Sequence, residues 1–218
     1  MKTNSVSLNE KLYFLQKKIE TGCSPEVKEL TEKTIKELTS YDVAAKSLNI
    51  NDIAPSHVLK NAVGDEFSFS PDNLNRPTIL LFYRGGWCPY CNVELHYYQE
   101  HLEEIKAKGC DLIAISPELP DNSLTLKEKE NLEFEILSDV NCELARKFGI
   151  APTKPSAFDQ MIAKLGLSLK ESYGDANDYL PIPSKFLLDS SGKILYRAFN
   201  PNYRERTELS EILAKLSA

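Results

Sequence analysis

The sequence predicts an α/β protein in which a partly parallel central sheet is flanked by helices and preceded by a helical arm. From residue 51 onward, strand and helix signals alternate along the chain, which is typical of a sheet with crossover helices. Residues 78–83 (TILLFY) are continuously apolar, as expected for a strand covered on both faces. Residues 8–40 show apolar positions at helical spacing with charges between them, which predicts the arm.

The arm comprises residues 1–50 and is predicted to contain two helices, broken between Gly22 and Pro25. Ser24 suits the N-cap of the second helix, and Pro25 suits its first position. Two interpretations of the arm remain open. It is either a layer packed on the main domain or the element through which two copies form a homodimer.

Residues 51–218 form the predicted main domain. A short strand is expected around Phe67 and Phe69, and the apolar strand 78–83 leads into the sequence RGGWCPYC. The later elements are expected as a helix over 89–106, a strand over 111–117, a helix over 122–131, a strand over 134–139, a helix over 141–148, a short helix near 158–165, two strands within 181–199 and a closing helix over 205–216.

Composition limits the function. The length of 218 residues and the 42% hydrophobic content suffice for one ordinary core with an appendage. The net charge of -6 argues against nucleic acid or an anionic membrane as partner, because both reward concentrated Lys and Arg. The amino terminus has no apolar stretch typical of a signal peptide, and no run approaches the length of a membrane span. We therefore expect a cytoplasmic protein with a small or neutral substrate.

The five cysteines are unevenly spaced and odd in number, unlike a secreted disulfide framework. Cys23, Cys110 and Cys142 stand alone and are interpreted as small hydrophobes. Only Cys88 and Cys91 form a motif. A zinc site would need two more soft ligands, and the chain has no second CxxC, so we expect neither a metal nor a cofactor.

The CxxC motif stands where a cysteine becomes reactive. Gly85 and Gly86 suit a tight turn from the strand into a helix, which places Cys88 at or next to the N-cap. There the free backbone N–H groups and the helix dipole stabilise a thiolate. Cys91 lies three residues further on the same helical face, where a disulfide can close. On this reasoning Cys88 attacks a disulfide substrate and Cys91 resolves the mixed disulfide.

Two resemblances follow from these residues. The sequence WCPYC at 87–91, after a buried strand, resembles the active-site turn of thioredoxins and glutaredoxins. The wider stretch 82–95, with APSHVL before it and DLIAISP and FEILSD after it, resembles the peroxiredoxin-like branch of the alkyl hydroperoxide reductase and thiol-specific antioxidant (AhpC/TSA) family. The resemblance covers about residues 50–217 and implies a thioredoxin-like fold.

The family pattern transfers to this chain only in part. Cys91 falls on the position of the peroxidatic cysteine, and Glu94 matches the family's acid. The family's proline is Arg84 here, and its threonine is Cys88. The position of a late family arginine holds Pro183, which resembles the cis-proline that faces the disulfide in thioredoxins.

The leading interpretation is thiol-dependent reduction of hydroperoxides, with Cys91 attacking the peroxide and Cys88 resolving the sulfenic acid. An external thiol donor of the thioredoxin, glutaredoxin or glutathione type then restores the pair. The second interpretation is a protein disulfide reductase with Cys88 as nucleophile. The third is a non-catalytic redox sensor on the same fold.

Three neighbours of the motif have two interpretations each. Arg84 stabilises a thiolate or the leaving oxygen, or is a solvated charge at a strand end. Glu94 exchanges protons with a cysteine or orients Arg84, or is solvated. Trp87 shields the sulfurs and shapes the docking surface, or is an ordinary packed aromatic.

Overall fold

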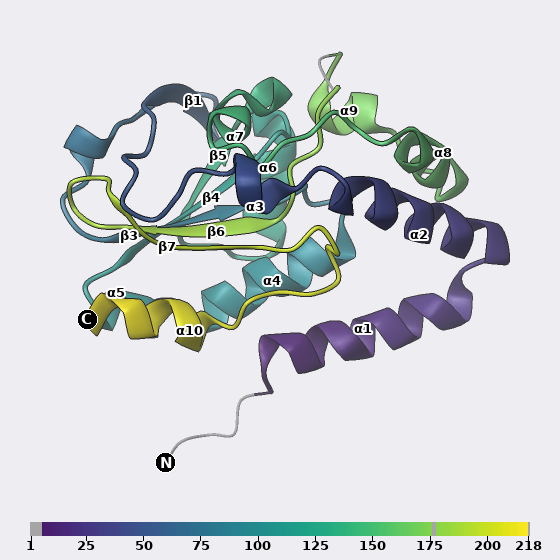
Figure 1. Ribbon diagram of the computed structural model, residues 1–218, viewed down its shortest axis with the longest axis horizontal. Helices are drawn as coiled ribbons and strands as arrows, with labels where there is room; N and C mark the ends of the chain where they lie inside the picture. The colour runs from purple at the N-terminus through teal and green to yellow at the C-terminus, as the bar shows by residue number, and fades with distance from the viewer. Residues whose placement is uncertain (1–5, 176–177, 218) are drawn as a thin grey trace.

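The computed structural model describes residues 6–175 and 178–217, which form a seven-stranded sheet with helices on both faces (Figure 1). The strands are β1 (His57–Asn61), β2 (Glu66–Phe69), β3 (Thr78–Phe82), β4 (Asp111–Ser116), β5 (Glu135–Ser138), β6 (Ser184–Leu188) and β7 (Ile194–Phe199). Their order across the sheet is β2-β1-β5-β4-β3-β6-β7. The central strands β3, β4 and β5 are parallel, and the outer strands pair antiparallel. The predicted mixed sheet is confirmed.

The helices are α1 (Leu8–Gly22), α2 (Pro25–Thr39), α3 (Val43–Lys46), α4 (Pro89–Glu100), α5 (Leu102–Ala107), α6 (Pro120–Lys129), α7 (Glu143–Lys147), α8 (Ser156–Lys164), α9 (Leu169–Tyr173) and α10 (Leu209–Leu213). Short 3-10 turns occur at Pro71–Asn73, Val140–Cys142 and Ala214–Ser217. Every residue of β3 is buried, and its side chains alternate between two hydrophobic cores. Helices α1, α4, α5, α6 and α10 cover one core, while α2, α3, α7, α8 and α9 cover the other.

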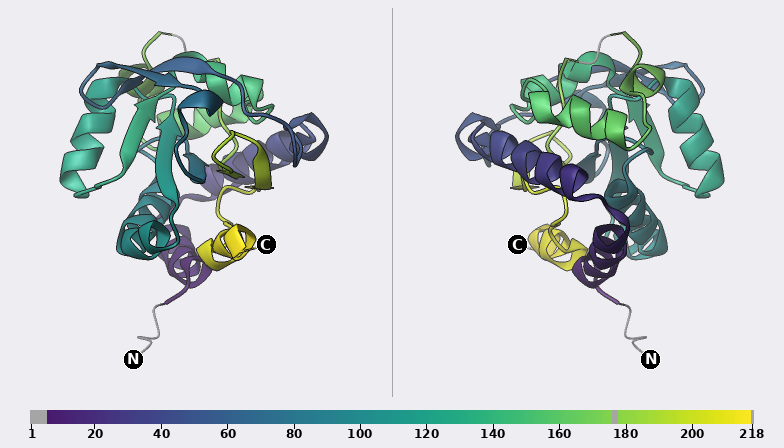
Figure 2. Two further views of the ribbon diagram at one scale, coloured as in Figure 1. Left: turned by 90° about the vertical axis from the view of Figure 1, so that its left-hand side faces the viewer. Right: turned by 90° about the vertical axis from the view of Figure 1, so that its right-hand side faces the viewer.

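The arm docks on both faces of the main domain, with α1 against α4 and α2 against α8. Figure 2 shows α1 beside α4 and close to the C-terminal helix. Leu8 and Leu12 of α1 are buried in one core, and Val27 and Leu38 of α2 in the other. The arm is therefore a packed layer of this chain. Its use in a homodimer and the domain boundary at residue 50 stay predictions.

The break between the two arm helices lies where the sequence places it. The Ser24 hydroxyl accepts a hydrogen bond from the Val27 N–H at 3.3 Å, and Pro25 opens α2. The cap separates the two helices of the arm, and α1 and α2 pack on different faces of the sheet.

Some elements differ from their predicted form. The helix expected over 89–106 is divided into α4 and α5 at His101, whose backbone leaves the helical region and whose ring bonds the Tyr97 carbonyl at 2.8 Å. Strand β1 and helices α3 and α9 were not predicted. All three are short, and β1 (HVLKN), in the outer part of the sheet, has only two apolar residues, Val58 and Leu59, which are adjacent.

The closing helix begins at Leu209 instead of near Glu205. The Glu205 carboxylate accepts hydrogen bonds from the side-chain amides of Asn200 (2.9 Å) and Asn202 (2.7 Å), which hold a turn there. This turn places Tyr203 and Arg206 against the first turns of α4. No helix in residues 6–175 or 178–217 is both long and apolar enough to cross a membrane.

Candidate active site

The strand-to-helix turn has the predicted geometry. After β3 the chain passes through Gly85 and Gly86, Cys88 is the N-cap of α4, and Pro89 is its first residue. Gly85 has a φ of +132°, and a Cβ atom there would lie 2.7 Å from the Glu118 side chain. Glycine is therefore required both for the turn and for the close approach of Glu118.

Cys88 lies in a buried and positively charged environment. Its sulfur is 3.0 Å from Nη2 of Arg84, and the side chain is fully buried. Burial alone would raise the pKa of Cys88, but the hydrogen bond from the Cys91 thiol and the charge of Arg84 hold this pKa well below its ordinary value. Cys88 is the thiolate of the pair.

Cys91 has the opposite character. Burial raises its pKa well above the ordinary value, and its hydrogen bond to Cys88 and the charge of Cys88 add to this effect. Arg206 opposes it from 3.9 Å, measured from Nη2 to the Cys91 sulfur. Both cysteines are free thiols in this structure. Of the two cysteines, Cys88 is therefore the one whose thiolate form the surroundings favour.

Arg84 is not a solvated charge. It is 2% exposed, and its guanidinium lies 3.6 Å from the centre of the Tyr203 ring and 5.1 Å from that of Trp87. Its backbone carbonyl accepts a hydrogen bond from the Tyr173 hydroxyl. These contacts fix the guanidinium beside Cys88, and the solvated interpretation is wrong.

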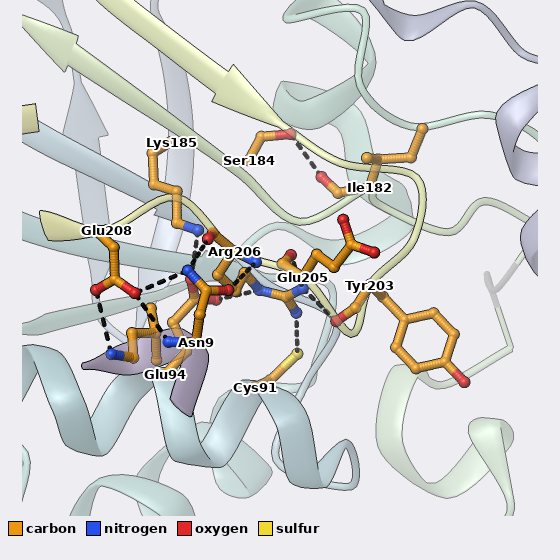
Figure 3. Close-up of polar contacts among 11 residues, drawn as sticks. Asn9, Cys91, Glu94, Ile182, Ser184, Lys185, Tyr203, Glu205, Arg206 and Glu208 are labelled. Atoms are coloured by element: carbon orange, nitrogen blue, oxygen red, sulfur yellow. Dashed lines mark hydrogen bonds and ion pairs between the residues drawn. The ribbon is translucent and has the colours of Figure 1, made fainter. Parts of the chain in front are cut away.

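Glu94 is also buried, but it does not orient Arg84. Its carboxylate forms ion pairs with Lys185 of β6 at 2.5 Å and with Arg206 at 2.8 Å (Figure 3). Burial would raise the pKa of Glu94, and the two cations hold it below its ordinary value. Two cations thus face one carboxylate, and one of them, Arg206, also contacts Cys91.

Several residues at the site were not predicted, among them Lys185, Tyr203, Arg206 and Glu118. Arg206 fell inside the expected C-terminal helix, and only the need of a buried Glu94 for a cation could have pointed to it. Glu118 follows β4, is 3% exposed, and accepts the Gly86 N–H at 2.8 Å. Burial raises the pKa of Glu118 to about 7, with a further increase from the Cys88 charge. Nothing in the local sequence distinguishes it from a surface glutamate.

Pro183 requires a correction. No cis peptide bond occurs within the described ranges, so the residue does not have the predicted cis form. The chain enters β6 in an extended conformation, with the Ile182 N–H bonded to the Ile150 carbonyl at 2.8 Å, and a trans bond is the ordinary preference before proline. The cationic group near the sulfurs comes instead from Arg84 and Arg206.

The remaining cysteines lie apart from these contacts. Burial raises the pKa of Cys110 to about 12 and that of Cys142 well above its ordinary value. Thiols of this kind are poor nucleophiles. Trp87 is half-buried and packs against Phe158 and Tyr173 beside Arg84.

A pocket of about 450 Å³ opens beside the CxxC motif. Arg84, Trp87, Tyr90 and Tyr203 line it on the motif side. The facing wall comes from the arm and α8 and consists of Gln16, Ile19, Glu20, Cys23, Val27, Lys28, Thr31, Glu32, Met161 and Ile162. Half of these ten side chains are apolar, and Trp87, Tyr90 and Tyr203 add aromatic surface, so a small organic molecule with an apolar group fits the pocket.

Comparison with known proteins places this site in a family. The sequence model of the AhpC/TSA family matches residues 50–197, which include strands β1 to β6, most of β7 and both cysteines of the motif. The chain belongs to the AhpC/TSA family. Peroxiredoxin Bcp of Escherichia coli is 29% identical over 103 residues, which span 47% of this chain and 65% of the relative. The chain thus spans somewhat less than two thirds of the length of that relative.

Solved AhpC/TSA-type structures share the fold. Peroxidoxin BcpB from Mycobacterium tuberculosis has a TM-score of 0.59 at 18% identity, and the match covers 78% of this chain and 97% of that one. A mutant of peroxiredoxin 6 from Arenicola marina has a TM-score of 0.62 at 18% identity, covering 78% and 72%. The resemblance stated from the sequence is confirmed for the family and the thioredoxin-like fold.

Proposed function

We propose that this protein reduces organic hydroperoxides through the Cys88–Cys91 pair, and that Cys88 attacks the peroxide. The observation that carries the proposal is the Arg84 guanidinium, which lies 3.0 Å from the Cys88 sulfur and also lines the apolar pocket. One cation thus stabilises the thiolate and faces the space that a hydroperoxide enters. Membership of a family that includes peroxiredoxins supports the same reaction.

In the first step the Cys88 thiolate attacks the outer oxygen of the hydroperoxide. An S–O bond forms, the O–O bond breaks, and the alcohol leaves after taking up a proton. The sulfur is oxidised to a sulfenic acid and the peroxide is reduced. Arg84 stabilises the negative charge that moves from sulfur to the leaving oxygen.

In the second step Cys91 attacks the sulfenic sulfur. The S–S bond forms, the S–O bond breaks, and the oxygen leaves as water with the proton of the Cys91 thiol. An external dithiol, or two molecules of a monothiol such as glutathione, then reduces the disulfide. The thioredoxin, glutaredoxin and glutathione types of donor all meet this requirement.

This order of attack reverses the assignment that the family resemblance implies. Cys91 occupies the family's peroxidatic position, but its pKa is raised by burial and by Cys88. Cys88 is the N-cap of α4 and contacts Arg84. Because the thiolate is the reactive form, the contacts favour Cys88 as the first nucleophile.

The buried position of the pair favours a small substrate over a protein disulfide. Both cysteines have 0% exposed surface. A protein disulfide must bring its own sulfur into contact with the attacking sulfur, which requires an exposed thiol. Disulfide reduction with Cys88 as nucleophile remains the second candidate, because the CxxC pair at a helix start supports it.

Single cysteine variants test the proposal. Cys91→Ser should consume one equivalent of cumene hydroperoxide rapidly and accumulate a sulfenic acid, because only the second step is lost. Cys88→Ser should react slowly. Stopped-flow fluorescence of Trp87, the only tryptophan, gives the rates, and mass spectrometry identifies the sulfenic acid.

The opposite result, rapid reaction of Cys88→Ser alone, would assign the attack to Cys91. Slow reaction of both variants, together with mixed disulfides trapped by Cys91→Ser, would assign the protein to disulfide reduction.

A further inference from the structure

The buried ion pairs near Cys91 contain one more positive charge than negative charge. Lys185 and Arg206 are both buried and both pair with the single carboxylate of Glu94. The Arg206 guanidinium also lies 3.9 Å from the Cys91 sulfur (Figure 3). Buried charges are costly unless they are paired. A thiolate on Cys91 would balance the second cation.

The arm contacts the backbone of Arg206, while the guanidinium of this residue donates to Glu94 and to the carbonyls of Tyr203 and Glu205. The side-chain amide of Asn9 donates to the Arg206 carbonyl at 2.7 Å, and its oxygen accepts the Arg206 N–H at 3.3 Å. Glu208, two residues on, accepts the N–H groups of Leu8 (3.1 Å) and Asn9 (2.9 Å) at the start of α1. Asn9 and Arg206 both lie outside residues 50–197, the stretch that matches the family.

We propose that Arg206 is a catalytic residue of the second step, in which Cys91 attacks the oxidised Cys88, and that Asn9 is its positioning residue. The N-terminal arm is then part of the active site. This inference rests on the proposed function for the order of the two steps.

The charge of Cys88 changes during the catalytic cycle. In the reduced protein, the Cys88 thiolate takes the hydrogen bond of the Cys91 thiol and opposes its ionisation. When Cys88 becomes a neutral sulfenic acid, this opposing charge is gone, while Arg206 remains. Cys91 then loses its proton to the departing hydroxide, which leaves as water, and its sulfur forms the disulfide. Arg206 thus acts after the peroxide has reacted.

Other groups also face Cys91 and bear on its ionisation. Arg84 approaches from the turn after β3 and lowers the pKa of Cys91, as Arg206 does. Lys185 of β6 interacts electrostatically with the sulfur, and Tyr83 is a neutral neighbour from the end of β3. The two arginines contact different cysteines. Among the described hydrogen bonds, Arg84 contacts the Cys88 sulfur and Arg206 contacts the Cys91 sulfur.

A titration that needs no peroxide tests the inference. In a Cys88→Ser background the neighbour of Cys91 is a neutral hydroxyl, as in the oxidised intermediate. Thiolate absorbance then reports the ionisation of Cys91. The absorbance of the other three cysteines is measured in the Cys88→Ser/Cys91→Ser double variant and subtracted. Adding Arg206→Gln should move the midpoint to a pH about one unit higher, a thiolate fraction about tenfold smaller at neutral pH. Arg206→Lys should restore most of the difference.

The arm has its own pair of variants. Asn9→Ala should move the midpoint in the same direction by a smaller amount, because Arg206 is then less firmly held. Lys11→Ala is the matched control on α1, since its ion pair with Glu100 of α4 at 2.6 Å also docks the arm but does not reach Arg206. Asn9 is exposed, so its variant tests the proposal even if Arg206→Gln does not fold.

In the otherwise unchanged chain, Arg206→Gln should slow disulfide formation about tenfold, and by a larger factor than it slows peroxide attack. An unchanged Cys91 midpoint in both Arg206→Gln and Asn9→Ala would overturn the proposal. A shift for Arg206→Gln with Asn9→Ala equal to Lys11→Ala would overturn the role of the arm. A failure of the proposed function is seen separately, as slow peroxide reaction of Cys91→Ser while the titration results stand.

Discussion

Replacement of Glu118 by glutamine should remove a pH-dependent loss of stability. Glu118 is 3% exposed, and its carboxylate contacts the backbone N–H of Gly86 at the active-site turn. Burial raises its pKa from 4.5 to about 7, the Gly86 and Trp87 N–H groups lower it in part, and the Cys88 charge raises it. The folded protein therefore keeps a proton on Glu118 up to about pH 7, whereas the unfolded chain releases it near pH 4.5.

The magnitude follows from the two pKa values. A difference between 4.5 and about 7 corresponds to roughly 3 kcal/mol of unfolding free energy. Because the folded pKa is the higher one, this stability is present below the unfolded value and is lost as pH rises toward the folded value. Between about pH 4 and about pH 8, the wild type should lose about 3 kcal/mol that the glutamine variant keeps.

Urea unfolding at a series of pH values, followed by Trp87 fluorescence, measures this difference. Glu103→Gln is the control, because the Glu103 side chain is 86% exposed and its ion pair with Lys106 lies on the surface of α5. The control should follow the wild type. Parallel curves for the wild type and Glu118→Gln would refute the reasoning, since they would mean that Glu118 ionises in the folded protein as readily as in the unfolded chain.

Three more predictions concern the site and the fold. Arg84→Met should raise the pKa of Cys88 and slow the reaction with peroxide about tenfold or more, as shown by thiolate absorbance and stopped flow; an unchanged pKa would contradict the role of the guanidinium. Val27→Phe should narrow the pocket and raise KM for cumene hydroperoxide several-fold while leaving hydrogen peroxide unaffected; equal effects on both would argue against the pocket. Gly149→Ala should cost about 3 kcal/mol or more in urea unfolding, because a Cβ there would lie 2.1 Å from a backbone oxygen, whereas Gly109→Ala, with nothing within 4 Å, should cost about 1 kcal/mol; similar losses would contradict the clash.

Much of the fold was predictable because its signals are local. The apolar run that forms β3 and the Ser24–Pro25 start of α2 each depend on a few adjacent residues. The start of α4 at Cys88 depends in the same way on the strand, the two glycines and Pro89. Short elements such as α9, and the division of the helix at His101, depend on packing and on single hydrogen bonds that composition does not reveal.

The site was predictable only within the motif. Sequence alone identified Cys88, Cys91 and Arg84 as a group, because they lie within eight positions. Arg206 reaches Cys91 across a separation of 115 residues, and Asn9 reaches Arg206 across 197. Such partners come together only when the chain folds, so their spacing along the sequence does not predict the contact. The same holds for Glu118, whose contact with Gly86 requires β3 and β4 to lie side by side.

The composite walls of the pocket limit what can be learned from relatives. The stretch that matches the AhpC/TSA family, residues 50–197, supplies the motif side and α8. The rest of the lining lies outside that stretch and comes from residues 16–32 of the arm, together with Tyr203 and Arg204 near the C-terminus. An inhibitor or substrate series can be optimised on a relative that shares only the matched stretch. Such a series would be fitted to only part of the lining of this pocket. Ligand screening for this protein calls for the whole chain, arm included, because many of the residues that line the pocket lie outside the family match.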